Sequence, residues 1–137
     1  MASDNQPPRP GSIVVVEDDQ ALGLAISRIL AKRGHDVEAV TSAAELRRYL
    51  ERRVPELILL DLHLPDEPGM DLIPDLKASE EPVSVVVITG DKNVNTVVEA
   101  MKLGADHFLP KPFDLERLVE EVERSLGEHR VRRRASV

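Results

Sequence analysis

The sequence predicts an α/β domain in which a five-stranded parallel sheet is covered by helices on both faces. Short runs of β-branched and aliphatic residues alternate along the chain with stretches whose apolar residues recur at helical spacing. The runs are apolar at consecutive positions, as expected for strands that are buried on both faces. Right-handed crossovers join such strands, and helices on both faces require the winding to reverse once. We therefore expect a ligand site at that reversal, outside the carboxyl ends of the strands.

Length and composition fit one domain with an aliphatic core. The chain has 137 residues, of which 42% are hydrophobic and 2% aromatic. The formal net charge of -7 argues against a nucleic-acid surface, which needs a positive field. No apolar run reaches membrane-spanning length, and we interpret the polar, Pro-rich segment 1–11 as a disordered arm rather than a secretion signal. The lack of cysteine excludes disulfides and is compatible with a cytoplasmic location.

The first part of the chain contains two strands, each followed by a helix. The β-branched run 13–16 ends in three acids and predicts a buried strand. A helix with Gly34 at its end follows, and residues 36–41 predict a weaker strand that suits a sheet edge. Segment 42–45 reads Ser-Ala-Ala-Glu, a capping box that starts the second helix. The apolar positions of the first helix are Leu22, Ile26, Ile29 and Leu30.

The most informative stretch is the run Leu57–Leu60, which ends in Asp61. Four large apolar residues between Pro55 and a Pro/Gly-rich loop predict a strand that is buried on both faces of the sheet. Asp61 would then lie at the carboxyl end of that strand, where parallel sheets place their ligands. Taken alone, Asp61 could equally well start a turn.

The second part of the chain repeats the alternation three times. Residues 70–76 predict a third helix, whose start Pro74 should distort or delay. An apolar strand at 83–89 precedes a helix that carries Val94, Val97, Val98 and Met101 on one face and is closed by Gly104. A short strand at 107–109 leads to a last helix between Asp114 as N-cap and Gly127 as stop. We therefore expect the domain to span residues 12–127, with 128–137 as a basic linker or tail.

Polar residues follow four of the predicted strands and suggest a site for a phosphoryl group. They are Glu17, Asp18 and Asp19 after the first strand, Asp61 after the third, Thr89 after the fourth and Lys111 after the fifth. Clustered carboxylates repel one another unless a cation is bound, and Mg²⁺ prefers oxygen ligands. Zinc is disfavoured, since there is no Cys and the four His lack ligand-like spacing. A hydroxyl and an ammonium would complete a cage for phosphoryl oxygens, and an ionised Asp can itself form an aspartyl phosphate.

In these residues the chain resembles the receiver domain of bacterial two-component response regulators. The resemblance covers Ser12 to Leu126 and is carried by the acids at 17–19, Asp-Leu-His-Leu-Pro at 61–65 with Gly69, Thr-Gly at 89–90, and Lys-Pro-Phe at 111–113. It implies a flavodoxin-like fold with strand order 2-1-3-4-5. Segment 96–105 is similar to receivers attached to enhancer-binding, sigma-54-dependent transcription activators.

The resemblance also assigns roles at the acidic end of the site. Asp61 matches the phosphoacceptor, which takes its phosphoryl group from a sensor histidine kinase or a histidine phosphotransfer protein. Glu17 and Asp18 match the pair that holds Mg²⁺, with Asp18 as direct ligand, and His63 would contribute its backbone carbonyl. Asp19 lies one position further on, so we expect it to cap the first helix. The His63 side chain departs from the small or amide residues usual there and would overhang the site.

Further roles follow for the remaining motif residues. Thr89 matches the switch hydroxyl, Phe108 the aromatic that turns inward on activation, and Lys111 the phosphate-binding lysine, with a cis Lys111-Pro112 peptide. The implied protein is a signalling phosphoacceptor rather than an enzyme, without direct nucleic-acid or membrane binding. It would form a phosphorylation-dependent homodimer and regulate transcription through an output domain that this chain lacks.

Plainer interpretations of each residue stay open. Glu17 and Asp18 could cap a helix, Thr89 could end a strand, Phe108 could fill the core and Lys111 could be a solvated turn residue. Two other functions also remain: a phosphatase of the haloacid-dehalogenase type, and a receiver-like docking module that is never phosphorylated. The phosphatase usually carries a second Asp two residues after its nucleophile, where this chain has His63.

Overall fold

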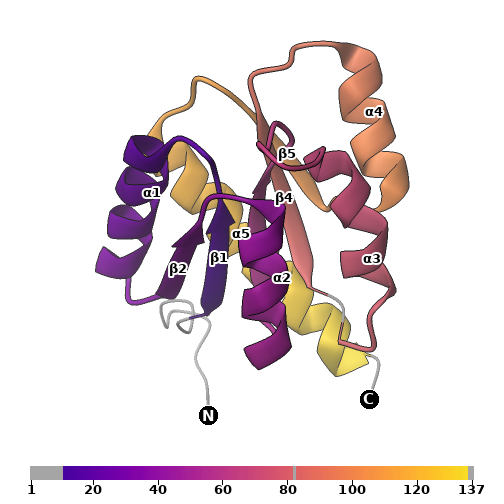
Figure 1. Ribbon diagram of the computed structural model, residues 1–137. Coiled ribbons are helices and arrows are strands. Elements are labelled where there is room, and N and C mark those ends of the chain that lie inside the picture. The colour runs from indigo at the N-terminus through magenta and orange to yellow at the C-terminus, as the bar shows by residue number, and fades with distance from the viewer. Residues whose placement is uncertain (1–10, 82, 136–137) are drawn as a thin grey trace.

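Five parallel strands form one sheet in the order β2-β1-β3-β4-β5 in the computed structural model, which describes residues 11–81 and 83–135. The predicted sheet and its strand order are therefore confirmed (Figure 1). All four neighbouring strand pairs are parallel, so all five carboxyl ends lie at one edge. The strands are β1 (Ser12–Val16), β2 (Asp36–Val40), β3 (Leu57–Asp61), β4 (Ser84–Thr89) and β5 (His107–Pro110).

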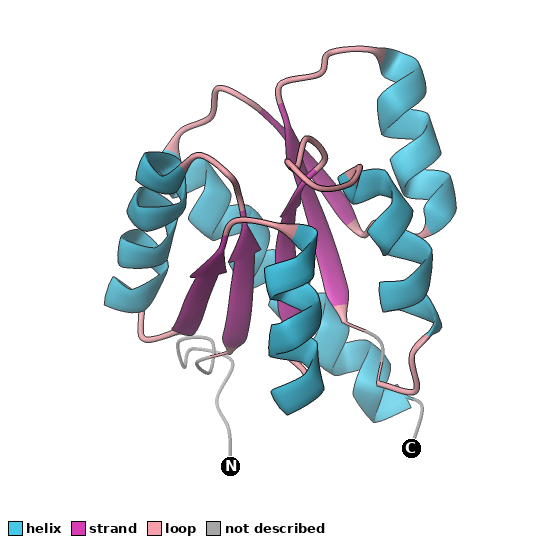
Figure 2. Ribbon diagram, in the orientation of Figure 1, coloured by secondary structure: helices cyan, strands magenta, loops and turns pink. Residues whose placement is uncertain are grey.

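Helices cover both faces of this sheet, as Figure 2 shows. Helices α1 (Gln20–Lys32) and α5 (Leu115–Ala135) pack their apolar stripes on one face. On the other face lie α2 (Ala43–Arg52), α3 (Leu72–Ala78) and α4 (Val94–Leu103). Because the two faces are covered by different helices, the chain reverses its winding between β1 and β3, and the site is expected above these two strands.

The core is aliphatic and centred on three strands. Every side chain in segments 13–16, 57–60 and 85–88 has no exposed surface. Burial of each such side chain contributes about 1.5–3 kcal/mol. The residues at the ends of these strands therefore extend directly from the buried core.

Helix starts follow the predicted capping residues. The Asp19 carboxylate accepts a hydrogen bond from the Leu22 amide at 3.1 Å, and the Ser42 hydroxyl accepts one from the Glu45 amide at 3.1 Å. A 3₁₀ turn, η1 (Gly69–Asp71), precedes α3, and Pro74 lies in the first turn of α3, where its missing amide hydrogen costs little. The α-helix thus begins at Leu72, after the 3₁₀ turn, and the effect of Pro74 on this start stays a prediction.

The predicted stop of the last helix at Gly127 is wrong, because α5 continues to Ala135. A glycine inside a helix costs only about 1 kcal/mol, which contacts beyond it can offset. His129 is buried, and Arg130 donates to both carboxylate oxygens of Glu56 at 3.0 and 3.1 Å. Whether segment 128–137 serves as a linker, and the boundary at 127, remain predictions.

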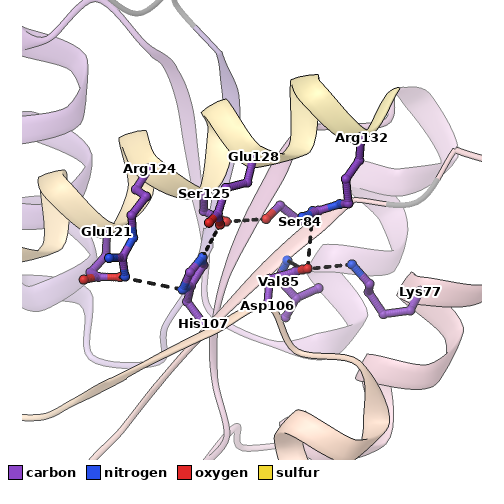
Figure 3. A network of polar contacts seen from close by, with 10 residues as sticks. All are labelled: Lys77, Ser84, Val85, Asp106, His107, Glu121, Arg124, Ser125, Glu128 and Arg132. Atoms are coloured by element: carbon purple, nitrogen blue, oxygen red, sulfur yellow. Dashed lines mark hydrogen bonds and ion pairs between the residues drawn. The ribbon is translucent and has the colours of Figure 1, made fainter. Parts of the chain in front are cut away.

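A polar network docks α5 against β4, β5 and the residue before β5 (Figure 3). The Asp106 carboxylate accepts from Lys77 at 2.8 Å and pairs with Arg132 at 3.3 Å. The His107 ring lies 2.6 Å from Glu128 on α5. The network ties the extended end of α5 to the strand that carries Phe108. Its other members include Ser84, Val85, Glu121, Arg124 and Ser125.

At the amino terminus, segment 1–10 of the predicted arm lies outside the described residues. Gly11 belongs to the fold: it is buried, and its amide donates to His35 Nδ1 at 3.1 Å. Within the described ranges, no helix is long and apolar enough to cross a membrane.

Candidate functional site

The residues predicted for the site lie at the carboxyl edge of the sheet. Strand register aligns the ends of β1, β3 and β4, since Val16 pairs with Leu60 and Leu60 with Val87. Glu17 and Asp61 therefore emerge side by side, and Thr89 follows on the next strand. The backbone amide of Lys111 donates to the Thr89 carbonyl at 2.8 Å, which brings the end of β5 to the same place.

Lys111 joins the ends of two other strands. Its ammonium donates to Glu17 Oε1 at 2.5 Å and to Asp61 Oδ2 at 3.0 Å. The Lys111-Pro112 peptide is cis, as the resemblance implied. Residues separated by 94 and 50 positions in sequence thus meet at one ammonium group.

Three carboxylates converge beside that ammonium. Oxygen atoms of Glu17, Asp18 and Asp61 all lie within 4.8 Å of one another. Glu17 and Asp61 are each only 2% exposed, whereas Asp18 is open to solvent. The buried pair is also held by backbone amides: His63 donates to Asp61 Oδ1 at 2.9 Å, and Asp19 donates to Glu17 Oε2 at 3.3 Å.

The pKa values of these groups reflect crowded negative charge. Burial raises the pKa of Glu17 to about 7, and the neighbouring Asp61 carboxyl adds to the rise. Burial alone would also raise the pKa of Asp61, but hydrogen bonds from Glu17, the His63 amide and Lys111 hold it below its ordinary value. Burial opposes the charge of Lys111, yet the two carboxylates raise its pKa. Asp61 is therefore ionised at neutral pH.

The donor set fits Mg²⁺. When all three carboxylates are ionised, one ammonium leaves two negative charges uncompensated, which a divalent cation would balance. The cluster offers only oxygen atoms, the ligands that Mg²⁺ prefers. A hollow of about 360 Å³ borders Asp18 and the loop after Asp61, including His63, so solvent ligands have room. The His63 carbonyl as a ligand stays a prediction.

Thr89 is the last residue of β4, and Phe108 lies on β5 opposite Val87. Thr89 is fully buried, and its hydroxyl accepts a hydrogen bond from the Asp91 amide at 3.1 Å. Phe108 is half-buried and packs against the core beneath α2, α3 and α4. Thr89 therefore lies on the strand that precedes α4, and Phe108 lies on the strand that follows it.

The sequence predictions did not include Asp91 or Asp66 among the residues that shape the site. They included Gly69, but without the reason why a glycine is needed there. Asp91 accepts from the Asn93 amide at 2.9 Å and the Thr96 hydroxyl at 2.8 Å, shaping the loop after Thr89. The Asp-x-Asn pattern is the signal that could have revealed this turn. A Cβ on Gly69 would lie 2.3 Å from the Asp61 backbone oxygen, so only glycine lets the loop pass there. Asp66, the second missed residue, binds the start of α2.

Comparisons with known proteins agree with this geometry. The family model for the response regulator receiver domain matches residues 13–123. Over 116 residues the chain is 38% identical to the DNA-binding transcriptional regulator NtrC of Azospirillum brasilense, an alignment that covers 85% of this chain and 24% of that protein. The chain spans about a quarter of the length of the curated NtrC relatives it matches.

Two solved structures extend the likeness to three dimensions. NtrX from Brucella abortus superposes with a TM-score of 0.87 at 30% identity, covering 93% of this chain and 29% of that one. The beryllofluoride-activated NtrC4 receiver domain dimer gives a TM-score of 0.81 at 30% identity, covering 86% of this chain and 98% of that one. With the sheet order, the converging acids and lysine, and these matches together, the chain belongs to the response regulator receiver domain family.

Proposed function

We propose that this domain is a phosphoacceptor switch in which Asp61 takes a phosphoryl group from a phosphohistidine. The donor would be a sensor histidine kinase or a histidine phosphotransfer protein. The observation that supports this most is the ammonium of Lys111 held between Glu17 and Asp61, with Asp18 alongside. Three carboxylates and a lysine at the end of a buried strand have no evident structural purpose, because their charges repel and must be desolvated.

The chemistry requires no separate base. An ionised carboxylate oxygen of Asp61 attacks the phosphorus, the P–N bond of the phosphohistidine breaks, and its electron pair returns to the imidazole. Lys111 would bind a phosphoryl oxygen, and the His63 amide would keep the carboxylate oriented. Glu17, Asp18, Asp61 and the His63 carbonyl would hold Mg²⁺, which when bound neutralises charge on the phosphoryl oxygens.

The signal would pass from Asp61 through Thr89 and Phe108 to α4. A phosphoryl group adds charge and acceptor oxygens, which the Thr89 hydroxyl can approach as a donor. Movement of Thr89 would free space for Phe108 to turn inward and would shift the start of α4. This is a change of population between two conformations, driven by differential contacts.

An apolar strip on α4 supports the homodimer as the activated state. Val94, Val98 and Met101 are 71%, 43% and 42% exposed, although they form the face predicted from helical spacing. The related NtrC4 receiver, activated by beryllofluoride, is a dimer. Comparing sedimentation with and without Mg²⁺ and beryllofluoride tests this proposal. We expect the wild type to dimerise only with beryllofluoride. Val98→Glu should abolish the dimer, whereas Leu24→Glu, a control at an exposed site on α1, should keep it. A Val98→Glu variant that still dimerises would contradict the proposal.

Phosphotransfer itself is tested with acetyl phosphate and Mg²⁺, followed by intact-mass spectrometry. We expect one phosphoryl group on the wild type, none on Asp61→Asn, and full labelling of Asp75→Asn, an exposed aspartate on α3. Labelling that is equal with and without Mg²⁺, or that persists in Asp61→Asn, would refute the proposal.

The wider role follows from the same proposal. The relatives are transcription regulators, so we propose that an output domain carries the response and that the domain acts in the cytoplasm, with its kinase partner. The family match does not favour a haloacid-dehalogenase-type phosphatase. Rapid hydrolysis of phosphate monoesters by this domain would support that function instead. Retention of the acids, Thr89 and Lys111 together disfavours a docking module that is never phosphorylated.

A further inference from the structure

We infer that Asp66 is a positioning residue for the acceptor site, which it serves by tying the loop after Asp61 to the first turn of α2. This inference rests on the proposed phosphoacceptor role of Asp61. The Asp66 carboxylate accepts from the Ala43 amide at 3.0 Å and from the Ala44 amide at 2.9 Å, one on each oxygen. These two residues lie more than twenty positions away in the chain.

The contact completes the cap of α2 from outside the helix. The first amides of a helix lack partners within it. Ser42 takes the third amide, at Glu45, and Asp66 takes the first two. The Glu45 carboxylate, which would close a capping box, instead accepts from the Thr41 hydroxyl at 2.7 Å. These hydrogen bonds also lower the pKa of Asp66, so the tie carries its charge at neutral pH.

The other end of the same loop holds the Asp61 carboxylate. His63 and Pro68 form an antiparallel bridge, and the Gly69 amide donates to the Leu62 carbonyl at 2.9 Å. The loop is therefore closed at its base, with the His63 amide directed at Asp61 Oδ1. Asp66 lies at the outer end of this closed loop and borders the same hollow as Asp18.

Asp66 makes the hydrogen-bonded link between that outer end and α2 from an exposed position, while Leu64 of the same loop packs against the core. The Arg47–Glu67 ion pair also joins the loop to α2, but the Arg47 side chain is 51% exposed, and such pairs hold weakly. Without Asp66, the outer end of the loop would lose its two hydrogen bonds to α2, and we expect the peptide units of His63 to shift. These units supply the amide to Asp61 and the carbonyl proposed for Mg²⁺, so both acceptor orientation and metal affinity depend on Asp66.

The test compares Asp66→Ala and Asp66→Asn with Ser42→Ala. Ser42→Ala is the matched control, because it also removes a hydrogen bond from a first-turn amide of α2 but lies outside the loop. Three quantities are measured: the ¹H–¹⁵N shift of the His63 amide, the Mg²⁺ affinity, and the initial rate of phosphorylation by acetyl phosphate. An asparagine offers a single acceptor oxygen, so Asp66→Asn should fall between the wild type and Asp66→Ala.

We expect Asp66→Ala to shift the His63 amide and to weaken both Mg²⁺ affinity and phosphorylation about tenfold, the lower end of the usual effect of residues that orient metal ligands. Ser42→Ala should leave all three unchanged. An unaltered His63 amide and Mg²⁺ affinity in Asp66→Ala, or equal losses in Ser42→Ala, would overturn the inference. If the wild type accepts no phosphoryl group, the proposed function fails, while the amide and Mg²⁺ measurements still decide the role of Asp66.

Discussion

A methyl group at Gly69 should destabilise the domain, because the chain passes there close to the backbone of the acceptor residue. An alanine Cβ would lie 2.3 Å from the Asp61 backbone oxygen and 2.9 Å from Leu62 Cα. The first distance is about 1 Å less than the 3.4 Å at which ordinary contact begins. Both neighbours are backbone atoms of the central strand or its first loop residue, so no flexible side chain can move aside.

The expected loss of stability follows from this overlap. Forcing a methyl group against backbone in a packed region costs about 1–3 kcal/mol. Alanine also lowers the conformational entropy of the unfolded chain relative to glycine, and this stabilises the folded state by about 0.4–1 kcal/mol. A net loss of about 1–2 kcal/mol corresponds to a fall in melting temperature of roughly 4–8 °C for a domain of this size.

Thermal and urea unfolding, followed by circular dichroism, measure the effect of Gly69→Ala. Gly127→Ala is the matched control, since it makes the same chemical change inside α5, where the new Cβ would meet no other part of the domain within 4 Å. There the helix should gain about 0.5–1 kcal/mol. If Gly69→Ala were as stable as Gly127→Ala, the close approach of the loop to Asp61 would be disproved.

Three further predictions concern ionisable groups. The pKa of Glu17 is raised to about 7, and Mg²⁺ binds the ionised carboxylate. Calorimetric titration should therefore find the Mg²⁺ affinity about tenfold weaker at pH 6 than at pH 8. Equal affinities at the two pH values would contradict the raised pKa. Burial lowers the pKa of His129 below its ordinary 6.5, so folding favours the neutral ring and stability falls as the pH drops below 6.5. Urea unfolding should show that the free energy of unfolding falls less between pH 7 and pH 5.5 in His129→Leu than in the wild type. An equal fall in both proteins would exclude His129 as the cause. Arg130 lowers the pKa of Glu56, so this carboxylate is ionised and paired at pH 7. Arg130→Ala should therefore reduce the free energy of unfolding at pH 7 by about 1 kcal/mol. Unchanged stability would mean that α5 beyond Gly127 packs on the domain without this ion pair.

The sheet and the convergence of the site could be predicted from sequence because both depend on local patterns. Uninterrupted apolar runs such as Leu57–Leu60 specify buried parallel strands, and a parallel sheet brings the residues after its strands to one edge. Helical spacing likewise located α4 from Val94 to Met101. It could not show that this face is exposed, since exposure depends on what the rest of the chain leaves uncovered.

The features that escaped prediction depend on contacts between distant residues. Gly127 has the identity of a helix stop, but the Arg130–Glu56 pair and the burial of His129 favour continuation of α5. Asp66 looks like an ordinary loop acid, and its amide partners lie on another element. Local propensity is weak compared with such tertiary interactions, so neither outcome was visible in the sequence.

The central claim is that Asp61 itself carries the phosphoryl group. The most direct measurement treats the domain with acetyl phosphate and Mg²⁺, reduces it with borohydride, which converts an aspartyl phosphate to homoserine, and maps the product by peptide mass spectrometry. The account predicts homoserine at position 61 and at no other aspartate. Homoserine at Asp18, or a phosphoryl group on a hydroxyl that resists reduction, would contradict it.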